Sequence, residues 1–369
     1  VLSEIPLAVL GGKGDNSTDN LLIFNVALAS DAEVIVLGEG VYRTSGEILI
    51  GVKQKKIRGA GQKNTEIKTT ATTGNIIKFA PAAPSVGNEF LANCGISNLT
   101  LGVIDTTFTG VGLYLEQTSG FKFDNVSTLS ILRGVVVAGG QLNQFSNFIL
   151  SAAGSTASTI ASSGVMEFIP TLNSDGVTYQ NPFTCEISNF SIGGSFLADC
   201  AIYITAADGL NFSTFYIGNA KNNSVHFDMN SVDENLIAVN FTNGYFDGVS
   251  DTTGTVNGVR ASSGGTKAIS GINFTNFFLA NYTGQGFSLG DDVGSFNISS
   301  GTISGIPSWG INATMDTNSI LLVSDMDFVN NGTDAGKGHI SVNQSRMVKI
   351  SDSRFDGASG TGSAGIKIV

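Results

Sequence analysis

The sequence predicts an all-β fold, a right-handed single-stranded parallel β-helix with a short N-terminal capping helix. The main observation is a phrase that returns along the 369 residues: an apolar residue, Ser/Thr/Asp, usually Asn or Asp, two variable residues, then an apolar one. Repetition every few tens of residues is typical of a solenoid, in which each unit buries its apolar face by stacking on its neighbours. Copies begin at Ile96, Phe123, Phe145, Ile187, Phe212, Phe241, Phe274, Ile298, Val323 and Ile350.

The centre of this phrase forms a column of mostly polar turn formers. Successive members are separated by 22 to 42 residues, which indicates one coil per repeat with loops of variable length. Asn tolerates the left-handed backbone region, and its amide can bond the equivalent amide one coil away, so the column is interpreted as a turn ladder. Its members are Asn98, Asn125, Asn147, Asn189, Thr214, Asn243, Asn276, Ser300, Asp325 and Asp352.

A second phrase alternates with the first: a small residue, usually Gly, followed by apolar, variable and apolar residues. Both phrases have a period of two, which indicates strands rather than the helices of helical repeat proteins. Strands of successive coils are expected to stack in parallel about 4.8 Å apart. The second phrase begins at Gly112, Gly134, Ala201, Ser224, Gly258, Gly286, Gly310 and Gly365, with looser copies at Gly164 and Gly338.

Composition agrees with a solenoid. The chain has 47 Gly, 6 Pro and 24 Phe but a single Trp, which predicts many tight turns and a long apolar interior. A solenoid core grows along one axis, so residues 1–369 are predicted to form one domain. Residues 1–70 are assigned to the N-terminal cap and first coils, and residues 71–369 to the repeating coils. No run of 18 apolar residues exists, so no membrane insertion is expected.

The charge narrows the range of partners. A net charge of −11 and a pI near 4.6 argue against nucleic acid and anionic membranes as partners. Cys94, Cys185 and Cys200 show no CxxC or Cys/His grouping, so they are interpreted as buried apolar residues. No metal and no cofactor is predicted.

The N-terminal section differs from the repeats. Residues 11–20 read GGKGDNSTDN, in which glycines allow a tight path, Ser17 or Thr18 can cap a helix, and Asp19 suits a first helical turn. Residues 21–29 are then predicted to form a helix that covers the open end of the solenoid.

This section resembles the start of the pectate-lyase-like superfamily found in phage tailspikes. The matching residues are Gly11, Lys13, Gly14, Asp15 and Asp19, whereas Gly12, Asn16, Asn20 and Leu21 depart from the motif. The likeness covers about the first 70 residues, and the remaining coils match by pattern.

The resemblance implies a virion tailspike, a receptor-binding protein that recognises host cell-surface polysaccharide. It also implies a homotrimer joined to virion tail or baseplate proteins and acting outside the host cell. The chain opens on Val1 and ends on a strand-like phrase at Val369, so further sequence or a cap from a partner is expected at the termini.

Outward positions of the two phrases point to a ligand site. The second phrase aligns Tyr203, His226 and Arg260 in one exposed column, and Glu167 joins it if its looser copy is shifted by one residue. The next outward position carries Asp228. In the other exposed column, an aromatic strip is predicted from Tyr216, Tyr245 and Phe278.

Aromatic faces beside convergent polar groups are typical of sugar sites, so the predicted groove spans about residues 165–280. The 42-residue interval at its edge either walls the groove or conceals one more coil. The predicted substrate-binding residues are Tyr203, His226, Arg260, Tyr216 and Tyr245.

Glycosidic hydrolysis would need two carboxylates, for which Glu167, Asp228 and Asp247 are the candidates. Glu167 and Asp228 are two coils apart in the alignment, roughly 10 Å, close to the range for an inverting enzyme. A lyase or epimerase would instead use His226, Arg260 and Lys221 as base and cations.

Three function classes stay open: a depolymerising tailspike, a spike or fibre that only adheres, and a secreted polysaccharide lyase or epimerase. The same outward columns would also suit contacts between subunits of a trimer.

Overall fold

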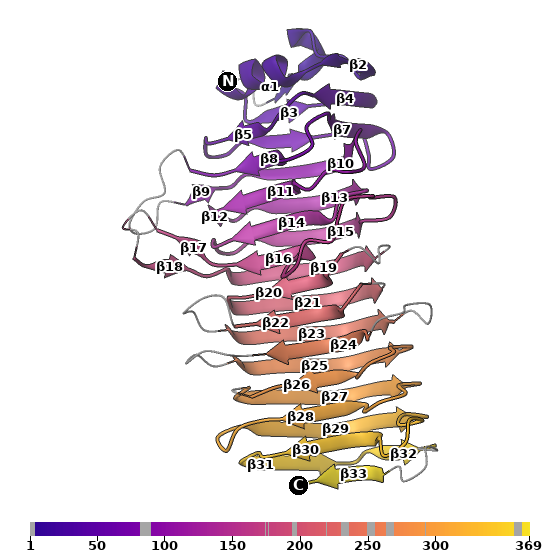
Figure 1. Cartoon of the computed structure of the whole chain (residues 1–369). Coiled ribbons are helices and arrows are strands. Elements are labelled where there is room, and N and C mark those ends of the chain that lie inside the picture. The colour runs from indigo at the N-terminus through magenta and orange to yellow at the C-terminus, as the bar shows by residue number, and fades with distance from the viewer. Residues whose placement is uncertain are drawn as a thin grey trace. The chain divides into compact units, whose positions relative to one another are not determined.

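The computed structural model describes two compact units, Val1–Ser191 and Ile192–Val369. In each unit, sheet A is built from strands of the first phrase and sheet B from strands of the second. The paired strands of both sheets are parallel, and the fold is the predicted right-handed parallel β-helix (Figure 1). The described residues are 4–81, 90–173, 175, 177–193, 198–218, 220–229, 236–248, 255–262, 269–291, 293–357 and 364–369.

The first unit begins with its cap. Strand β1 (Glu4–Pro6), the 3-10 helix η1 (Leu7–Leu10) and β2 (Asp15–Asp19) precede α1 (Leu21–Ala29), which lies at the N-terminal end of the stacked strands (Figure 1). The helix has the predicted bounds. It buries Phe24 and Ala27 completely.

The predicted helix cap is wrong. Ser17 and Thr18 lie in β2, and the residue before the helix is Asn20, whose side chain makes no capping bond. The Asn20 carboxamide instead accepts from the Lys13 backbone N–H at 2.8 Å and donates to the Lys13 carbonyl at 3.0 Å. Asp19 is the last residue of β2 and not part of the first helical turn as predicted, but it accepts from the Leu21 N–H at 3.1 Å.

Sheet A of the first unit begins as two separate rows that merge into longer strands. One row is β1, β3 (Val34–Val36) and β6 (Lys56–Arg58), and the other is β2, β4 (Gly40–Thr44) and β7 (Thr65–Thr69). Both rows pair with β10 (Gly95–Val103), which continues to β13 (Lys122–Leu129) and β15 (Gln144–Ser151). Strand β19 (Phe183–Gly193) carries the next copy of the phrase. Sheet B is β5 (Ile48–Ile50), β8 (Asn75–Phe79), β11 (Val111–Glu116), β14 (Arg133–Ala138) and β16 (Gly164–Ile169).

Four short strands complete this unit. Strands β9 (Leu91–Ala92) and β12 (Thr118–Ser119) pair in parallel, and β17 (Thr171–Leu172) and β18 (Tyr179–Gln180) form an antiparallel hairpin. The hairpin and β16 both fall within the 42-residue interval. The described residues of this interval supply no further sheet A strand, so it is one coil with an insertion.

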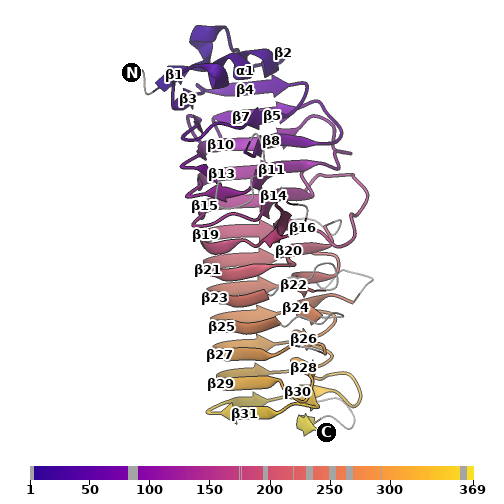
Figure 2. The same ribbon diagram turned by 90° about the vertical axis from the view of Figure 1, so that its left-hand side faces the viewer.

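The second unit repeats the two-sheet pattern (Figure 2). Its sheet A is β21 (Ala207–Gly218), β23 (Leu236–Asp247), β25 (Ile269–Ala280), β27 (Ser295–Ser304) and β29 (Ile320–Val329), followed by β31 (Met347–Ser351) and β32 (Arg354–Asp356). Its sheet B is β20 (Cys200–Ile204), β22 (Asn223–Asp228), β24 (Asn257–Ser262), β26 (Phe287–Leu289), β28 (Ile311–Thr314), β30 (Gly338–Asn343) and β33 (Ala364–Ile368).

The predicted turn column is confirmed. Its ten residues all have φ between 51° and 56°, the left-handed region. The Asn125 Nδ2 donates to the Asn98 Oδ1 at 2.6 Å, and the Asn276 Nδ2 donates to the Asn243 Oδ1 at the same distance. Each left-handed residue bends its sheet A strand, so the outer face of the sheet changes direction along this column.

Phenylalanines stack inside the second unit. The Phe241 ring lies between those of Phe212 and Phe274, with centroid distances of 4.3 and 4.8 Å and interplanar angles of 3° and 2°. The three cysteines are buried, as predicted. Among the described residues, no helix is long and apolar enough to span a membrane.

Candidate functional site

Three aromatic rings form an exposed stack on sheet A of the second unit. Tyr216, Tyr245 and Phe278 are register partners on β21, β23 and β25. Their centroids are 5.6 and 5.2 Å apart and their planes differ by 9° and 7°. Each residue keeps 37 to 39% of its surface exposed, which confirms the predicted aromatic strip.

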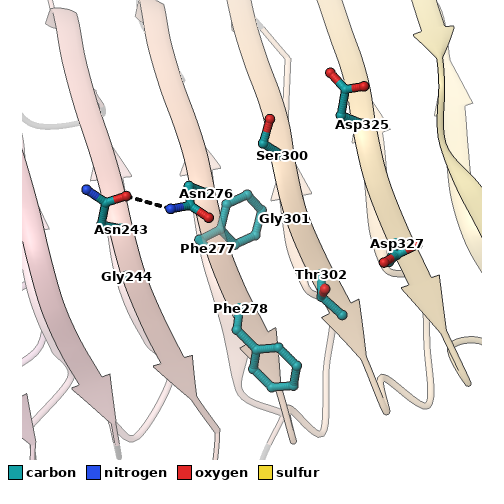
Figure 3. A pocket seen from close by; sticks show the side chains of 10 residues that line it. All are labelled: Asn243, Gly244, Asn276, Phe277, Phe278, Ser300, Gly301, Thr302, Asp325 and Asp327. Atoms are coloured by element: carbon teal, nitrogen blue, oxygen red, sulfur yellow. Dashed lines mark hydrogen bonds between the residues drawn. The ribbon is translucent and has the colours of Figure 1, made fainter.

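Phe278 is the last ring of this stack. Tyr245 covers one face of the Phe278 ring, and the register partner on the other side is Thr302 of β27, a much smaller side chain (Figure 3). The face of the Phe278 ring that points away from Tyr245 is therefore not covered by a further aromatic ring.

An open groove of about 530 Å³ includes Phe278 in its lining, and we call it the Phe278 groove. It crosses β23, β25, β27 and β29, and its size is within the range of ligand pockets. Its lining residues, shown in Figure 3, are Asn243, Gly244, Asn276, Phe277, Phe278, Ser300, Gly301, Thr302, Asp325 and Asp327.

Two glycines allow neighbouring rings to pack here. A Cβ added to Gly244 would collide with the Phe215 ring, and one added to Gly301 would lie 2.8 Å from the Phe277 ring. Both rings are nearly buried, with 6% and 5% of their surface accessible, so the two glycines leave room for them on the inner side of the sheet. On the outer side, Gly244 and Gly301 line the groove with backbone alone.

The polar groups of the groove are mainly acceptors. Asp325 and Asp327 lie two residues apart on β29, beside the hydroxyls of Ser300 and Thr302 on β27 (Figure 3). Asp325 occupies the left-handed turn column, with φ of 53°. Lys and Arg are absent from the lining residues, so the groove presents negative charge.

Asp247, one of the predicted carboxylates, supports the aromatic strip. It accepts from the Tyr216 hydroxyl at 3.2 Å and from the Asn281 Nδ2 at 2.9 Å. Partial burial and the charge of Asp247 both raise the pKa of Tyr216 and of Tyr245 above the ordinary value of 10.0, so both phenols are neutral at pH 7.

Glu167 lies in the first unit and is engaged by a cation. Its register partner is Val136, which confirms the predicted one-residue shift. The prediction that it is exposed is wrong, because only 2% of Glu167 is accessible. Its two carboxylate oxygens accept from the Nε and Nη2 of Arg133 at 2.7 Å each, and this bidentate pair compensates for the burial of its charge.

Tyr203, His226 and Arg260 are register partners on sheet B of the second unit, as predicted. Arg260 is exposed, but the predicted exposure of Tyr203 and His226 is wrong, since they are 3% and 9% accessible. Asp228 is also buried, and it accepts from the Tyr203 hydroxyl at 2.8 Å. Bonds between neighbouring strands therefore hold these polar groups under cover.

The predicted site residues fall into separate groups. Tyr216, Tyr245 and Asp247 lie on sheet A, whereas Tyr203, His226, Arg260 and Asp228 lie on sheet B. The predicted spacing of Glu167 and Asp228 stays a prediction, because the two residues belong to different units.

Two groove carboxylates escaped the sequence analysis. Asp325 was interpreted as a turn residue, and Asp327 lies beyond the predicted end of the groove near residue 280. A signal was present, since the outward column places Phe278, Thr302 and Asp327 on successive coils. The described residues contain no cluster of three or more potential metal ligands.

Comparisons with known proteins give structural matches only. No family model and no curated protein matches the chain. Solved structures do match. The surface adhesin PfbA of Streptococcus pneumoniae has a TM-score of 0.67 and 12% identity, with 98% of this chain and 93% of the adhesin covered.

Two further solved structures match the chain. The GH87 α-1,3-glucanase of Streptomyces thermodiastaticus matches with a TM-score of 0.63, 12% identity and coverage of 98% and 69%. Tailspike protein 3 of bacteriophage CBA120 matches with a TM-score of 0.59, 14% identity and coverage of 98% and 61%. The chain shares the parallel β-helix fold of these proteins. It spans 60 to 61% of the length of the two viral proteins that it matches.

Proposed function

We propose that this chain is the polysaccharide-binding part of a phage tailspike-type receptor-binding protein, and that a sugar ring docks in the Phe278 groove. The observation that carries the proposal is the uncovered face of the last ring in an exposed aromatic stack, turned toward a groove with carboxylates and hydroxyls. The shared fold with a tailspike, a glucanase and an adhesin supports the class of function.

The groove has the two kinds of group that bind a sugar. The C–H face of a pyranose packs on an aromatic ring, and Phe278 offers one with 37% of its surface exposed. Sugar hydroxyls donate to carboxylates in charge-assisted bonds, for which Asp325 and Asp327 are placed across β27 from Phe278 (Figure 3).

The negative charge of the groove should disfavour acidic sugars. Two carboxylates line the groove, no lining residue is Lys or Arg, and the whole chain has a net charge of −11. Arg354, the register partner of Asp327 on β32, is paired with Asp356 at 3.4 Å. A uronic acid would add a third negative charge at close range, which is unfavourable. The proposed ligands are therefore neutral or amino sugars of a host cell-surface polysaccharide.

Glycosidic hydrolysis is a second candidate function of the same groove. Asp325 and Asp327 are two residues apart on one strand, and both carboxylates line the groove. Glycosidic hydrolysis uses such a pair of carboxyl groups. A binding-only spike and a lyase or epimerase that uses His226 and Arg260 remain the alternatives.

The remaining parts of the proposal come from the resemblance to tailspikes. The protein is proposed to be a homotrimer, attached to virion tail or baseplate proteins and acting outside the cell on the host surface. The proposed function involves neither binding of nucleic acid nor insertion into a membrane.

The test measures binding to a panel of purified bacterial surface polysaccharides. Phe278→Ala removes the sugar platform and should weaken binding tenfold or more, about 1.4 kcal/mol. Thr302→Tyr should extend the aromatic stack into the groove and abolish binding. Ile149→Tyr is the matched control, because it places a ring at an exposed position of the same kind on sheet A of the first unit.

The same panel is assayed for reducing ends. A hydrolase should release them, and Asp325→Asn or Asp327→Asn should slow release roughly 100-fold or more. Binding without release would leave a receptor-binding protein. Unchanged binding by both Phe278→Ala and Thr302→Tyr would contradict the proposed site.

A further inference from the structure

Sheet B of the second unit carries a hydrogen-bonded nucleophile and base outside the Phe278 groove. The Ser262 Oγ on β24 and the His226 Nε2 on β22 are 2.9 Å apart. Ser262 is the register partner of Asp228, so it meets His226 across a diagonal of the sheet. A serine hydroxyl within hydrogen-bond distance of an imidazole is the arrangement that activates serine in acyl transfer.

The imidazole is suited to accept a proton. Burial lowers the pKa of His226 below its ordinary value of 6.5, and the positive charge of Arg260 acts in the same direction. The negative charges of Asp228 and Asp199 act in the opposite direction and are outweighed. His226 is therefore neutral at pH 7, and its Nε2 can take the Ser262 proton.

The Asp228 carboxylate favours the imidazolium that this transfer creates. Asp228 lies two residues from His226 on the same face of β22, and the Tyr203 hydroxyl fixes its carboxylate at 2.8 Å. The Tyr203 ring also meets the His226 ring edge-on, with centroids 5.6 Å apart. The base is thus held between a positioned carboxylate and an aromatic ring.

Solvent reaches the pair from one side. Arg260 is exposed and Ser262 is partly exposed, although His226 behind them is 9% accessible. Arg260 and Ser262 lie two residues apart on β24, and therefore on the same face. The guanidinium is a charge partner for an oxyanion that forms at a carbonyl attacked by Ser262.

We propose that Ser262 and His226 hydrolyse small acyl esters, such as O-acetyl groups carried by a polysaccharide. The Ser262 Oγ forms a bond to the acyl carbon while its proton passes to the His226 Nε2. The ester bond then breaks, and the alcohol leaves with that proton. Water attacks the acyl-serine in the same way, which releases the carboxylic acid and restores Ser262. The polysaccharide as carrier rests on the proposed function, whereas the ester chemistry does not.

The test uses the full chain and three readouts. A fluorophosphonate probe should form a covalent adduct that mass spectrometry of peptides places on Ser262. The chain should hydrolyse p-nitrophenyl acetate and release acetate from an O-acetylated polysaccharide. Ser262→Ala and His226→Gln should each lower both rates roughly 100-fold or more. Ser288→Ala is the matched control, because Ser288 is the register partner of Arg260 on the next strand.

The pH profile separates a base from a structural histidine. The rate should rise with pH through an apparent pKa below 6.5, because only neutral His226 accepts the proton. The charged and titratable groups that face His226 are Asp228, Asp199, Arg260 and Tyr203. Absence of an adduct on Ser262, or acetate release that survives in folded Ser262→Ala, would overturn the proposal. The labelling readout needs no variant and no glycan, so its result is independent of binding in the Phe278 groove.

Discussion

Glu167 carries a charge that the fold uses for its own stability. The Arg133–Glu167 pair is bidentate, and the two side chains are 26% and 3% exposed. The Gly164 N–H also donates to the Glu167 carboxylate at 3.1 Å. A carboxylate engaged by three donors has a structural task, whereas its catalytic role stays a prediction. The sequence pattern identified an outward position but not its burial.

Replacing Glu167 should therefore affect stability and not function. Glu167→Gln leaves Arg133 without its ionic partner, which should cost about 1–3 kcal/mol, less than for a fully buried pair because Arg133 is partly exposed. A lower urea midpoint with unchanged polysaccharide binding is expected. Glu4→Gln is the matched control, since Glu4 forms a bidentate pair with Arg58 at the exposed surface and its loss should shift the midpoint little.

A loss of reducing-end release by folded Glu167→Gln, with binding and the midpoint unchanged, would instead support the catalytic role that the sequence suggested.

The turn column shows what residue-level analysis does predict. Thr214 is β-branched and ordinarily avoids positive φ, yet it adopts 53° like the asparagines of its column. Stacking against equivalent bends on neighbouring coils fixes this backbone. The position within the repeat therefore outweighs the preference of the single residue, and a repeat alignment captures that position.

At the scale of one element, β23 shows how the bend distributes side chains. Phe241 precedes the left-handed Asn243 and is fully buried, whereas Tyr245 follows it and is 37% exposed. They are four positions apart, which would place them on one face of a straight strand. The repeated phrase predicted this reversal, because it contains the bend at a fixed place.

The two positions should differ strongly in their effect on folding. Phe241→Ala removes a ring stacked between two others and should cost about 3–5 kcal/mol. Tyr245→Ala leaves no buried cavity and should lower the free energy of unfolding by under about 1 kcal/mol. Urea denaturation followed by circular dichroism measures both values. Similar costs at the two positions would contradict the assigned inward and outward faces.

Sheet B strands show the limit of the period-two pattern. It placed Tyr203, His226 and Arg260 in one column correctly, but only Arg260 is exposed. The period fixes which side chains point away from the interior. It does not encode what packs over them, such as the diagonal contacts of Tyr203 with Asp228 and of His226 with Ser262.

At the scale of the whole molecule, repetition made the topology predictable but not the place where the surface is hollow. The columns that contain Phe278, Thr302 and Asp327 could be read from the repeats. The groove is lined by residues of four strands, β23, β25, β27 and β29. It depends on side chains of several coils together, so no single repeat displays it.

The oligomeric state decides whether exposed rings serve a ligand or another subunit. A homotrimer should have a mass of about 115 kDa by light scattering after gel filtration, three times the chain mass of 38.2 kDa. Because Tyr216, Tyr245 and Phe278 are assigned to sugar binding, Phe278→Ala and Thr302→Tyr should lose binding while the trimer mass persists. A variant that falls to 38.2 kDa would place the strip in a subunit contact instead. A monomeric wild type that still binds polysaccharide would reject the trimer and retain the groove.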